Sequence, residues 1–150
     1  RAVRYGRPLT VAIADLDHLK QVNDRWTHAT GDAVLKAIAN LLVREVRHTD
    51  LVARYGGEEF VLVLLETGPE AASAVCEKVR AAVESHDWSG IAPGLAITVS
   101  IGWCADTSLA GPDAMLGAAD AAMYRAKAAG RNRVSGGRYS ASAGNSASEP

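Results

Sequence analysis

The chain has 150 residues, of which 48% are hydrophobic and 22% are charged, and its formal net charge is -1. Such a composition is ordinary for one globular domain, and the small charge gives no electrostatic basis for binding a DNA or RNA polymer. No apolar run reaches the roughly 20 residues that a membrane span needs, so we expect no membrane contact by this fragment. No secretory signal opens the chain, and Cys76 and Cys104 are expected to be core thiols of a cytoplasmic protein.

The first third of the chain predicts one strand and two helices. Residues 9–15 alternate Leu, Val and Ile with small partners, which is typical of a strand. Apolar residues at helical spacing predict a short helix over about 17–26, and 27–31 should break it. Asp32 is a plausible N-cap for the next helix, whose apolar stripe continues to near Arg47.

A hairpin follows, and it carries two adjacent carboxylates. Two β-prone runs, 51–53 and 60–65, are separated by a segment that contains Gly56 and Gly57. A Gly-Gly pair favours a tight turn because glycine tolerates a positive φ, and it lets a ligand approach the backbone. Glu58 and Glu59 come directly after the turn. An acidic surface hairpin would explain this motif if it stood alone.

The next segment predicts a helix and a strand. Thr67 and Glu70 have the spacing of a capping box, so a helix is expected to begin here and to continue to about Ser85. A loop rich in Gly and Pro leads to residues 96–103. Their regular alternation predicts a half-buried strand.

The last predicted helix covers 113–129 and ends at Gly130, a residue well suited to the C′ position. Residues 131–134 have the pattern of a short additional strand. Ser, Gly and Ala dominate from residue 135 onward, so 135–150 is expected to be a disordered tail. The chain is therefore interpreted as one domain, 1–134, of a longer protein truncated before Arg1.

The order of elements predicts an α+β fold of the ferredoxin-like kind. It has a central, mainly antiparallel sheet with flanking helices, similar to the palm of nucleotidyl cyclases. In that topology the first strand lies beside the hairpin, so Asp15 and Glu58 come together. Two carboxylates beside a Gly-Gly backbone suit a hard cation such as Mg²⁺. The residues alone thus indicate metal-assisted phosphoryl or nucleotidyl transfer.

Five ordered blocks resemble the GGDEF-domain diguanylate cyclases, in their GGEEF form. The blocks are 56–60 (GGEEF), 15–24 (DLDHLKQVND), 28–32 (HATGD), 99–102 (VSIG) and 119–132 (ADAAMYRAKAAGRN). The resemblance implies that two GTP molecules are condensed into cyclic di-GMP with release of two pyrophosphates. It also implies Mg²⁺, or Mn²⁺, as the cofactor.

The resemblance assigns the catalytic and metal-binding roles by position. Asp15, the Leu16 carbonyl and Glu58 would hold the divalent metal. Glu59 would help with a second metal or with deprotonation of the ribose 3′-hydroxyl. Gly57 would let the nucleotide approach the turn.

Substrate-binding roles follow from the same blocks. Asn23 and Asp32 would contact the guanine edge, since an amide donates and accepts and a carboxylate accepts from guanine N–H groups. Lys20, Lys127 and Arg131 would hold the phosphates. For Lys127 and Arg131 a simpler alternative is that they complement the dipole of the last helix.

An inhibitory site and a homodimer are also implied. Arg47 and Asp50 match the family's R-x-x-D product-inhibition site, and Lys78 stands where a second basic contact is often found. Arg47 and Asp50 could instead be an ordinary helix-end Arg and a capping Asp. Because the product joins two GTP molecules, two copies of the domain are expected to face each other as a twofold pair.

Several alternatives remain open from sequence. The domain could bind GTP or cyclic di-GMP for signalling without turnover, or it could be another nucleotidyl cyclase or polymerase-like palm. Asp17 matches the second Asp of the family's D-x-D block, but it could also simply cap the short helix. Leu19 and Thr27 depart from the family, which usually has Phe and Gly at these positions.

Overall fold

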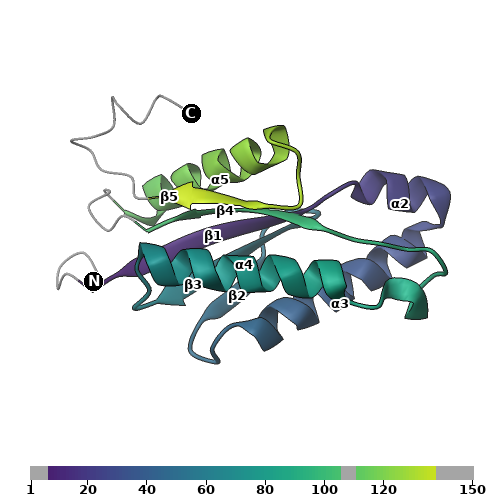
Figure 1. Ribbon diagram of the computed structural model, residues 1–150, viewed down its shortest axis with the longest axis horizontal. Helices are drawn as coiled ribbons and strands as arrows, with labels where there is room; N and C mark the ends of the chain where they lie inside the picture. Colours follow the sequence, from purple (N-terminus) through teal and green to yellow (C-terminus); the bar gives the residue numbers. More distant parts are fainter. Residues whose placement is uncertain (1–6, 106–110, 138–150) are drawn as a thin grey trace.

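The computed structural model describes residues 7–105 and 111–137, which form a five-stranded sheet with helices on both faces (Figure 1). The elements in chain order are β1 (Leu9–Leu16), α2 (Leu19–Arg25), α3 (His28–Glu45), β2 (Leu51–Arg54), β3 (Glu59–Leu65), α4 (Pro69–Ser85), the 3-10 helix η1 (Trp88–Gly90), β4 (Val99–Cys104), α5 (Pro112–Ala128) and β5 (Val134–Gly137). This architecture confirms the predicted α+β class.

The strand order is β2-β3-β1-β4-β5, which places β1 at the centre of the sheet. β1 pairs antiparallel with β3 on one side and with β4 on the other, and only β4 and β5 run parallel. The prediction that the first strand lies beside the hairpin is therefore confirmed. The C-terminal end of β1 meets the hairpin end of β3.

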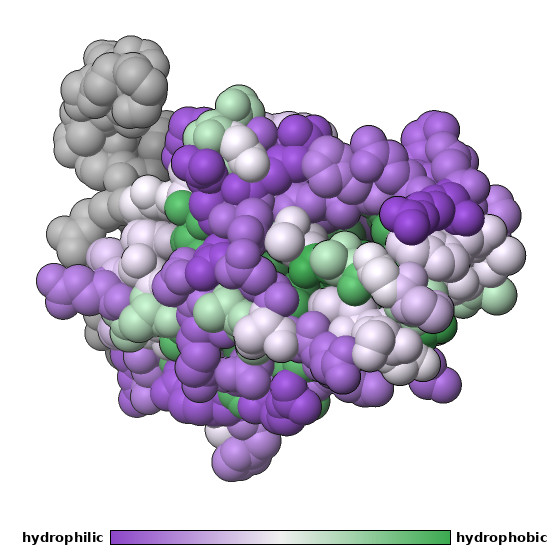
Figure 2. Space-filling view, turned by 45° about the vertical axis from the view of Figure 1, so that its right-hand side comes forward, coloured by the Kyte–Doolittle hydropathy of each residue, from purple (hydrophilic) through white to green (hydrophobic). Residues whose placement is uncertain are grey.

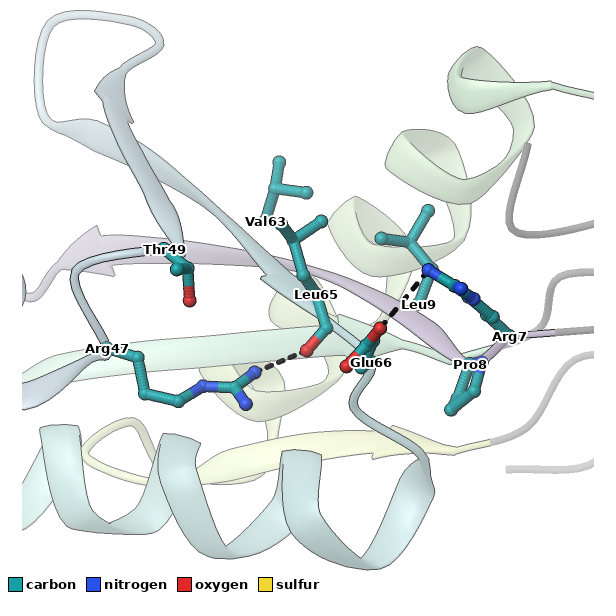
Figure 3. A pocket seen from close by; sticks show the side chains of 8 residues that line it. All are labelled: Arg7, Pro8, Leu9, Arg47, Thr49, Val63, Leu65 and Glu66. Carbon is teal, nitrogen blue, oxygen red and sulfur yellow. Dashed lines mark hydrogen bonds and ion pairs between the residues drawn. The ribbon is translucent and has the colours of Figure 1, made fainter.

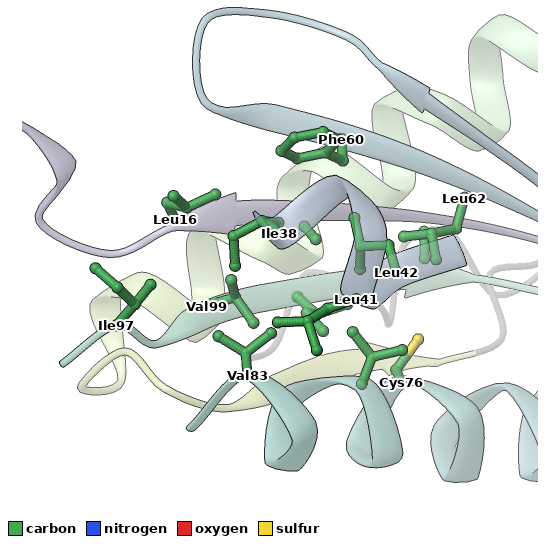
Figure 4. Close-up of a cluster of buried hydrophobic side chains, with 14 of the residues drawn as sticks. Leu16, Ile38, Leu41, Leu42, Phe60, Leu62, Cys76, Val83, Ile97 and Val99 are labelled. Atoms are coloured by element: carbon green, nitrogen blue, oxygen red, sulfur yellow. The ribbon is translucent and has the colours of Figure 1, made fainter. Parts of the chain in front are cut away.

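Helices α3 and α4 cover one face of the sheet and α5 covers the other (Figure 1). Alternate residues of β1 face the two layers: Ala12, Ala14 and Leu16 belong to the core under α3 and α4, whereas Val11 and Ile13 belong to the smaller core under α5. Figure 4 shows the larger core, whose members come from both helices and three strands. Full burial of one such Leu or Ile side chain stabilises the fold by about 2 kcal/mol.

Close contact between β4 and α5 depends on Gly102. A Cβ atom built on this glycine would lie 2.0 Å from the backbone nitrogen of Met123 and 2.4 Å from the carbonyl oxygen of Ala119. Any side chain here would push α5 away from the sheet. The glycine therefore brings the last helix, with Lys127 on it, close to the end of β1.

Two predicted helix starts were wrong. The residue before α2 is His18, which has a left-handed φ of 62° and makes no side-chain cap hydrogen bond. Helix α3 begins at His28 rather than after Asp32, because Thr27 is the N-cap and its side chain accepts a hydrogen bond from the Thr30 N–H. The threonine that replaces the family's glycine thus starts the helix, and residues 28–31 form its first turn instead of a loop.

The boundaries of α4 and β4 also differ from expectation. Gly68 precedes α4 as its N-cap and Pro69 occupies the first turn, so the predicted capping box does not form. The Thr67 hydroxyl instead donates to the Leu65 carbonyl at 2.9 Å. β4 begins at Val99, three residues later than predicted.

The C-terminal limit of the fold lies beyond the predicted one. β5 includes residues 135–137, which were expected to start a disordered tail, and it pairs parallel with β4 from Ile101↔Val134 to Cys104↔Gly137. Backbone pairing with β4 explains the strand despite its Ser and Gly composition. The remainder of the expected tail, 138–150, lies outside the described residues.

The hairpin is wider than the predicted two-residue turn. β2 ends at Arg54 and β3 begins at Glu59, so four residues connect them. Neither Gly56 nor Gly57 adopts a positive φ. The carbonyl of Glu59 accepts from the Tyr55 N–H at 2.7 Å and from the Gly56 N–H at 3.3 Å, which closes the loop.

The molecular face seen in Figure 2 is largely hydrophilic, with apolar atoms visible mainly in recesses between hydrophilic side chains. Of the helices in the described part of the chain, none has the length and hydrophobicity that crossing a bilayer requires. Cys76 and Cys104 are both buried thiols, as predicted, and no disulfide joins them.

Candidate active site

Carboxylates from β1 and from the hairpin converge at one end of the sheet. Asp15 lies directly opposite Glu59 in the β1–β3 register, so both side chains are on the α5 face. The Leu16 N–H donates to the Glu58 carbonyl at 3.2 Å. These contacts bring the residues predicted to be catalytic to within one strand spacing of each other.

The two glutamates resist ionisation. Burial, a hydrogen bond with Asp15 and the negative charges of Asp15, Asp120 and Glu58 raise the pKa of Glu59 to about 7. Burial and the charge of Asp15 likewise raise the pKa of Glu58, although Lys127 partly opposes the shift. The negative charge of this cluster is therefore larger than the positive charge near it. Such an imbalance is typical of a site that binds a cation.

One cation from the protein itself lies on this cluster. The Lys127 ammonium is 2.9 Å from the Asp15 carboxylate, 2.9 Å from the Asp17 carboxylate and 3.0 Å from the Leu16 carbonyl oxygen. Two of these three groups, the Asp15 side chain and the Leu16 carbonyl, are the ligands predicted for a divalent metal. A positive charge is thus already bound by part of the predicted metal-ligand set.

The donor set fits Mg²⁺ or Mn²⁺. In the described residues no group of three or more His, Cys, Asp or Glu side chains is arranged to hold a metal ion. Mg²⁺ does not need such a group, because it binds through one or two carboxylates and keeps water or phosphate oxygens in its other positions. Asp15, Glu58 and the Leu16 carbonyl provide this number of hard oxygen ligands.

Asp17 has a structural role that sequence reasoning missed. Its side chain is 1% exposed, and its two oxygens accept from the hydroxyls of Thr98 and Ser100, both at 2.7 Å, as well as from Lys127 and the Asn132 N–H. Burial alone would raise its pKa, but the hydrogen bonds from Thr98, Ser100 and Lys127 outweigh burial and hold the pKa below its usual value. Asp17 does not cap α2, contrary to the simpler of the two alternatives.

A left-handed turn follows α5 and carries Arg131. Gly130, Arg131 and Asn132 have φ values of 131°, 65° and 50°, so three consecutive residues adopt a conformation that favours glycine. The Arg131 side chain is exposed. Its N–H donates to the Ala126 carbonyl at 3.0 Å, and the next N–H, of Asn132, donates to Asp17. The turn thus holds Arg131 next to the end of β1.

Of the two residues predicted to contact guanine, Asn23 lies on α2 and Asp32 lies on α3. Among the described side chains, Asn23 has a buried Oδ1 atom that accepts no hydrogen bond. A Cβ atom on Gly31 would lie 1.9 Å from this oxygen, so only glycine at position 31 allows this placement. Asp32 is exposed and borders a hollow of about 390 Å³ that Leu35, Arg54 and Phe60 also line. The unsatisfied Asn23 amide oxygen and the Asp32 carboxylate beside the hollow are both suited to accept hydrogen bonds from the polar edge of a ring.

The remaining predicted contacts are placed differently. Lys20 lies exposed on α2 and pairs with Asp24 at 3.1 Å, so it does not reach the carboxylate cluster. Gly57 is at the tip of the hairpin, where an added Cβ would meet no atom within 4 Å. Backbone approach by a ligand is therefore open at this glycine.

Arg54 is a further contributor that the sequence motifs did not identify. Its Nη2 donates to the Gly57 carbonyl at 2.5 Å and its Nε donates to the Gly56 carbonyl at 3.2 Å. The guanidinium thus fixes the carbonyls of the two tip glycines. Its position at the base of the loop, directly before Tyr55, could have indicated this role, since an Arg there can donate to the carbonyls of the turn.

Arg47 and Asp50 lie together at the opposite end of β3. Asp50 accepts from the Arg47 N–H, the Arg47 guanidinium and the Leu65 N–H, and Arg47 also donates to the Leu65 carbonyl (Figure 3). The Asp50 side chain is 3% exposed, whereas that of Arg47 is 56% exposed and borders a hollow of about 570 Å³. Lys78, on α4, pairs with Glu45 at 4.0 Å. Asp50 therefore holds the segment between α3 and β2 in place, whereas the Arg47 guanidinium exposes a positive charge beside the hollow.

Comparison with known proteins identifies the class to which this fold and site belong. The sequence profile described as "Diguanylate cyclase, GGDEF domain" matches residues 1–133. The diguanylate cyclase DgcP of Pseudomonas aeruginosa is 42% identical over 134 residues, covering 89% of this chain and 20% of DgcP. The response regulator PleD of Caulobacter vibrioides is 39% identical over 140 residues, covering 91% of this chain and 31% of PleD.

Solved structures agree with the sequence comparison. The active GGEEF domain of a diguanylate cyclase from Vibrio cholerae superposes with a TM-score of 0.82 at 32% identity, covering 93% of this chain and 89% of that one. The GGDEF domain of DgcB from Caulobacter crescentus, solved in complex with c-di-GMP, gives a TM-score of 0.79 at 34% identity, covering 90% and 81%. The chain belongs to the GGDEF-domain family of diguanylate cyclases. It spans only about a fifth to a third of the length of the full-length relatives named above.

Proposed function

We propose that this domain, with its GGEEF hairpin, is a diguanylate cyclase that condenses two GTP molecules into cyclic di-GMP. The observation that carries the proposal is the meeting of Asp15, Glu58 and Glu59 under a cationic side chain, beside an open hairpin tip. The family relationship supplies the substrate class. The cluster supplies the chemistry, because converging hard oxygen ligands suit a metal that neutralises phosphate charge.

Each residue has a distinct role in this proposal. Asp15, Glu58 and the Leu16 carbonyl hold Mg²⁺ or Mn²⁺, which polarises the α-phosphate when bound. Lys127 and Arg131 bind the triphosphate. Their cationic groups suit phosphate oxygens, and Lys127 is the cation nearest the carboxylates in the part of the chain that the structure describes.

Base recognition and proton transfer fall to other side chains. Asn23 and Asp32 bind the guanine edge, supported by the unsatisfied Asn23 Oδ1 and the hollow beside Asp32. Glu59, with a pKa near 7, is suited to take the proton of the ribose 3′-hydroxyl as its oxygen attacks phosphorus and pyrophosphate leaves. Gly57 allows the nucleotide to approach the hairpin. Lys20 would have to leave Asp24 before it could contact phosphate.

Catalysis requires two copies of the domain. The described chain contains one such carboxylate cluster, whereas the product contains two phosphodiester bonds formed between two GTP molecules. A twofold pair in which each copy holds one GTP supplies both reaction centres. The substrate is a cytoplasmic nucleotide, and the reduced thiols of Cys76 and Cys104 fit that compartment.

Product analysis tests the proposal. The purified chain is incubated with Mg²⁺ and either GTP or ATP over a hundredfold range of protein concentration, and products are identified by mass spectrometry. Cyclic di-GMP from GTP alone, with specific activity that rises with protein concentration, is the expected result. A different cyclic nucleotide would identify another nucleotidyl cyclase. Specific activity that stays constant in a chain shown to be monomeric would contradict the twofold mechanism.

Product inhibition is proposed at Arg47, Asp50 and Lys78. The exposed Arg47 guanidinium beside a hollow supports it, since arginine binds guanine or phosphate through paired donors. Arg47→Ala should weaken cyclic di-GMP binding in calorimetry, while Arg44→Ala, a change of an exposed arginine three residues earlier, should not. Unchanged affinity in the Arg47 variant would place the inhibitory site elsewhere. A module that binds without turnover is the second candidate, and GTP binding without product would favour it.

A further inference from the structure

Residues on α4 are connected to the proposed phosphate-binding turn through one side chain. The Asn132 amide oxygen accepts from Arg80 Nη1 at 2.9 Å, and its amide nitrogen donates to Glu84 at 2.9 Å. Both polar atoms of the side chain are thus used, and both partners lie on the helix at 69–85. The Asn132 backbone N–H meanwhile donates to the buried Asp17 carboxylate at 3.0 Å.

Arg80 is itself held in place. Its side chain is 15% exposed, and it is bound by Glu77 at 2.6 Å and by Glu84 at 2.8 Å. A guanidinium with two carboxylate partners and little exposure has few alternative rotamers, because moving it would break several charge-assisted hydrogen bonds. Arg80 therefore offers Asn132 a fixed point of attachment.

The conformation of the turn requires such an attachment. Arg131 and Asn132 both have left-handed φ values, and a non-glycine residue adopts this region only when its surroundings hold it there. The Arg131 N–H donates to the Ala126 carbonyl, and Asn132 adds the contacts that join the turn to α4 and to Asp17. If Asn132 were released, the backbone from which the Arg131 side chain projects would lose its attachments to α4 and to Asp17.

We propose that Asn132, clamped by Arg80 and Glu84, is a positioning residue that directs Arg131, and through Asp17 also Lys127, toward the phosphates of the nucleotide. This inference rests on the proposed function, because it assumes that these two cations bind phosphate. It assigns a role in substrate binding to Arg80, a residue of α4 that lies outside the carboxylate cluster. Arg80 acts through Asn132 and needs no contact with the nucleotide.

The experiment compares two ligands in three single variants and in the double variant of Arg80 and Asn132. Arg80→Met removes the clamp, and Asn132→Gly removes the clamped amide while tolerating a left-handed φ. Glu70→Gln is the control, because Glu70 is an exposed carboxylate at the other end of the same helix, and its affinities should equal those of the unmodified chain. Calorimetry in Mg²⁺ then measures binding of 3′-deoxy-GTP, which cannot react, and of GMP, which lacks two phosphates.

The expected loss is specific to the triphosphate. In Arg80→Met and Asn132→Gly the Kd for 3′-deoxy-GTP should rise about tenfold, since small errors in orientation are costly. The Kd for GMP should stay within about twofold of the unmodified value, and the double variant should bind no more weakly than the weaker single variant, since both changes remove one interaction. Hydrogen exchange at the backbone N–H of residue 132 should accelerate in both Arg80→Met and Asn132→Gly, while the β1 amides stay protected.

Two results would overturn the inference. Equal losses for both ligands would mean that the clamp supports the fold in general. Faster exchange with unchanged 3′-deoxy-GTP affinity would mean that order in the turn does not matter for phosphate binding. If the unmodified chain bound 3′-deoxy-GTP no more tightly than GMP, the phosphate-binding roles in the proposed function would be refuted first, and this inference with them.

Discussion

Asp15 and Asp17 are two residues apart, yet their surroundings are opposite. Asp15 faces Glu59 and lies near Glu58, and the pKa values of both glutamates are raised. Asp17 accepts hydrogen bonds from four donors, and its pKa is lowered. The first carboxylate belongs to a cluster whose negative charge Lys127 only partly offsets, whereas the second is fully satisfied by the protein.

The different surroundings of the two aspartates indicate two different roles, one in binding and one in stabilising the fold. An acidic cluster that destabilises its own charged state is suited to bind an external cation, because the cation relieves the repulsion. A buried carboxylate with all its acceptor positions filled contributes to the fold instead. The D-x-D sequence thus combines one residue proposed to bind the metal and one structural residue.

The largest effect is expected from the Glu58→Gln substitution. A neutral amide is a poor Mg²⁺ ligand, so product formation should fall about a hundredfold or more, given the several kcal/mol that a metal contributes to transition-state stabilisation. Thermal unfolding should show that the fold is retained. Glu70→Gln, a change of an exposed carboxylate on α4, should leave turnover unchanged. Normal turnover by the Glu58 variant would remove Glu58 from the metal site.

Asp17→Ala should produce the largest loss of stability. It leaves Thr98, Ser100 and Lys127 without their common acceptor, which should lower the free energy of unfolding by about 3 kcal/mol. Asp15→Asn should change it by less than about 1 kcal/mol in metal-free buffer, because lost contacts with Lys127 are offset by reduced repulsion. Urea unfolding of both variants measures this difference, and equal losses at the two positions would contradict the comparison.

Lys127→Met should strengthen metal binding in the absence of nucleotide. The ammonium contacts Asp15 and the Leu16 carbonyl, so it competes with a divalent ion for the same oxygens. Mn²⁺ affinity, measured by electron paramagnetic resonance, should rise about tenfold, on the order expected when a nearby like charge is removed. Lys20→Met removes a distant, exposed lysine and is the control. Weaker Mn²⁺ binding by the Lys127 variant would show that the lysine supports the site instead.

The smallest effect concerns pH. The folded-state pKa of Glu59 is about 7, above its ordinary value of 4.5, so protonated Glu59 favours the folded state. Its contribution is fully present below about pH 4.5 and is lost as the pH rises through 7. In metal-free buffer, Glu59→Gln should therefore raise the Tm by a few degrees at pH 8 and change it little at pH 5. A Tm difference that does not depend on pH would argue against the raised pKa.

Much of the site was predictable because short-range pattern and strand order determine it. Alternation in residues 9–15 and the β-prone apolar run 60–65 identified β1 and β3, and the order of elements placed β1 beside the hairpin. Once these strands pair, Asp15 must approach Glu58 and Glu59, since the ladder fixes which residues are opposite. The approach of the carboxylates proposed to be catalytic is thus a consequence of the sequence pattern.

Other features depended on contacts between segments far apart in the chain. β5 formed from a Ser-Gly segment because β4 offered it a pairing edge. The start of α3 is a local matter, since Thr27 caps the helix through the Thr30 N–H. The roles of Asp17, Asn132 and Arg80 could not be read from spacing, since their partners lie up to 115 residues away. The sequence by itself determined the strands, the family and the carboxylates of the site. Only the tertiary structure decided which charges are satisfied, because that depends on the donors that folding brings within hydrogen-bond distance.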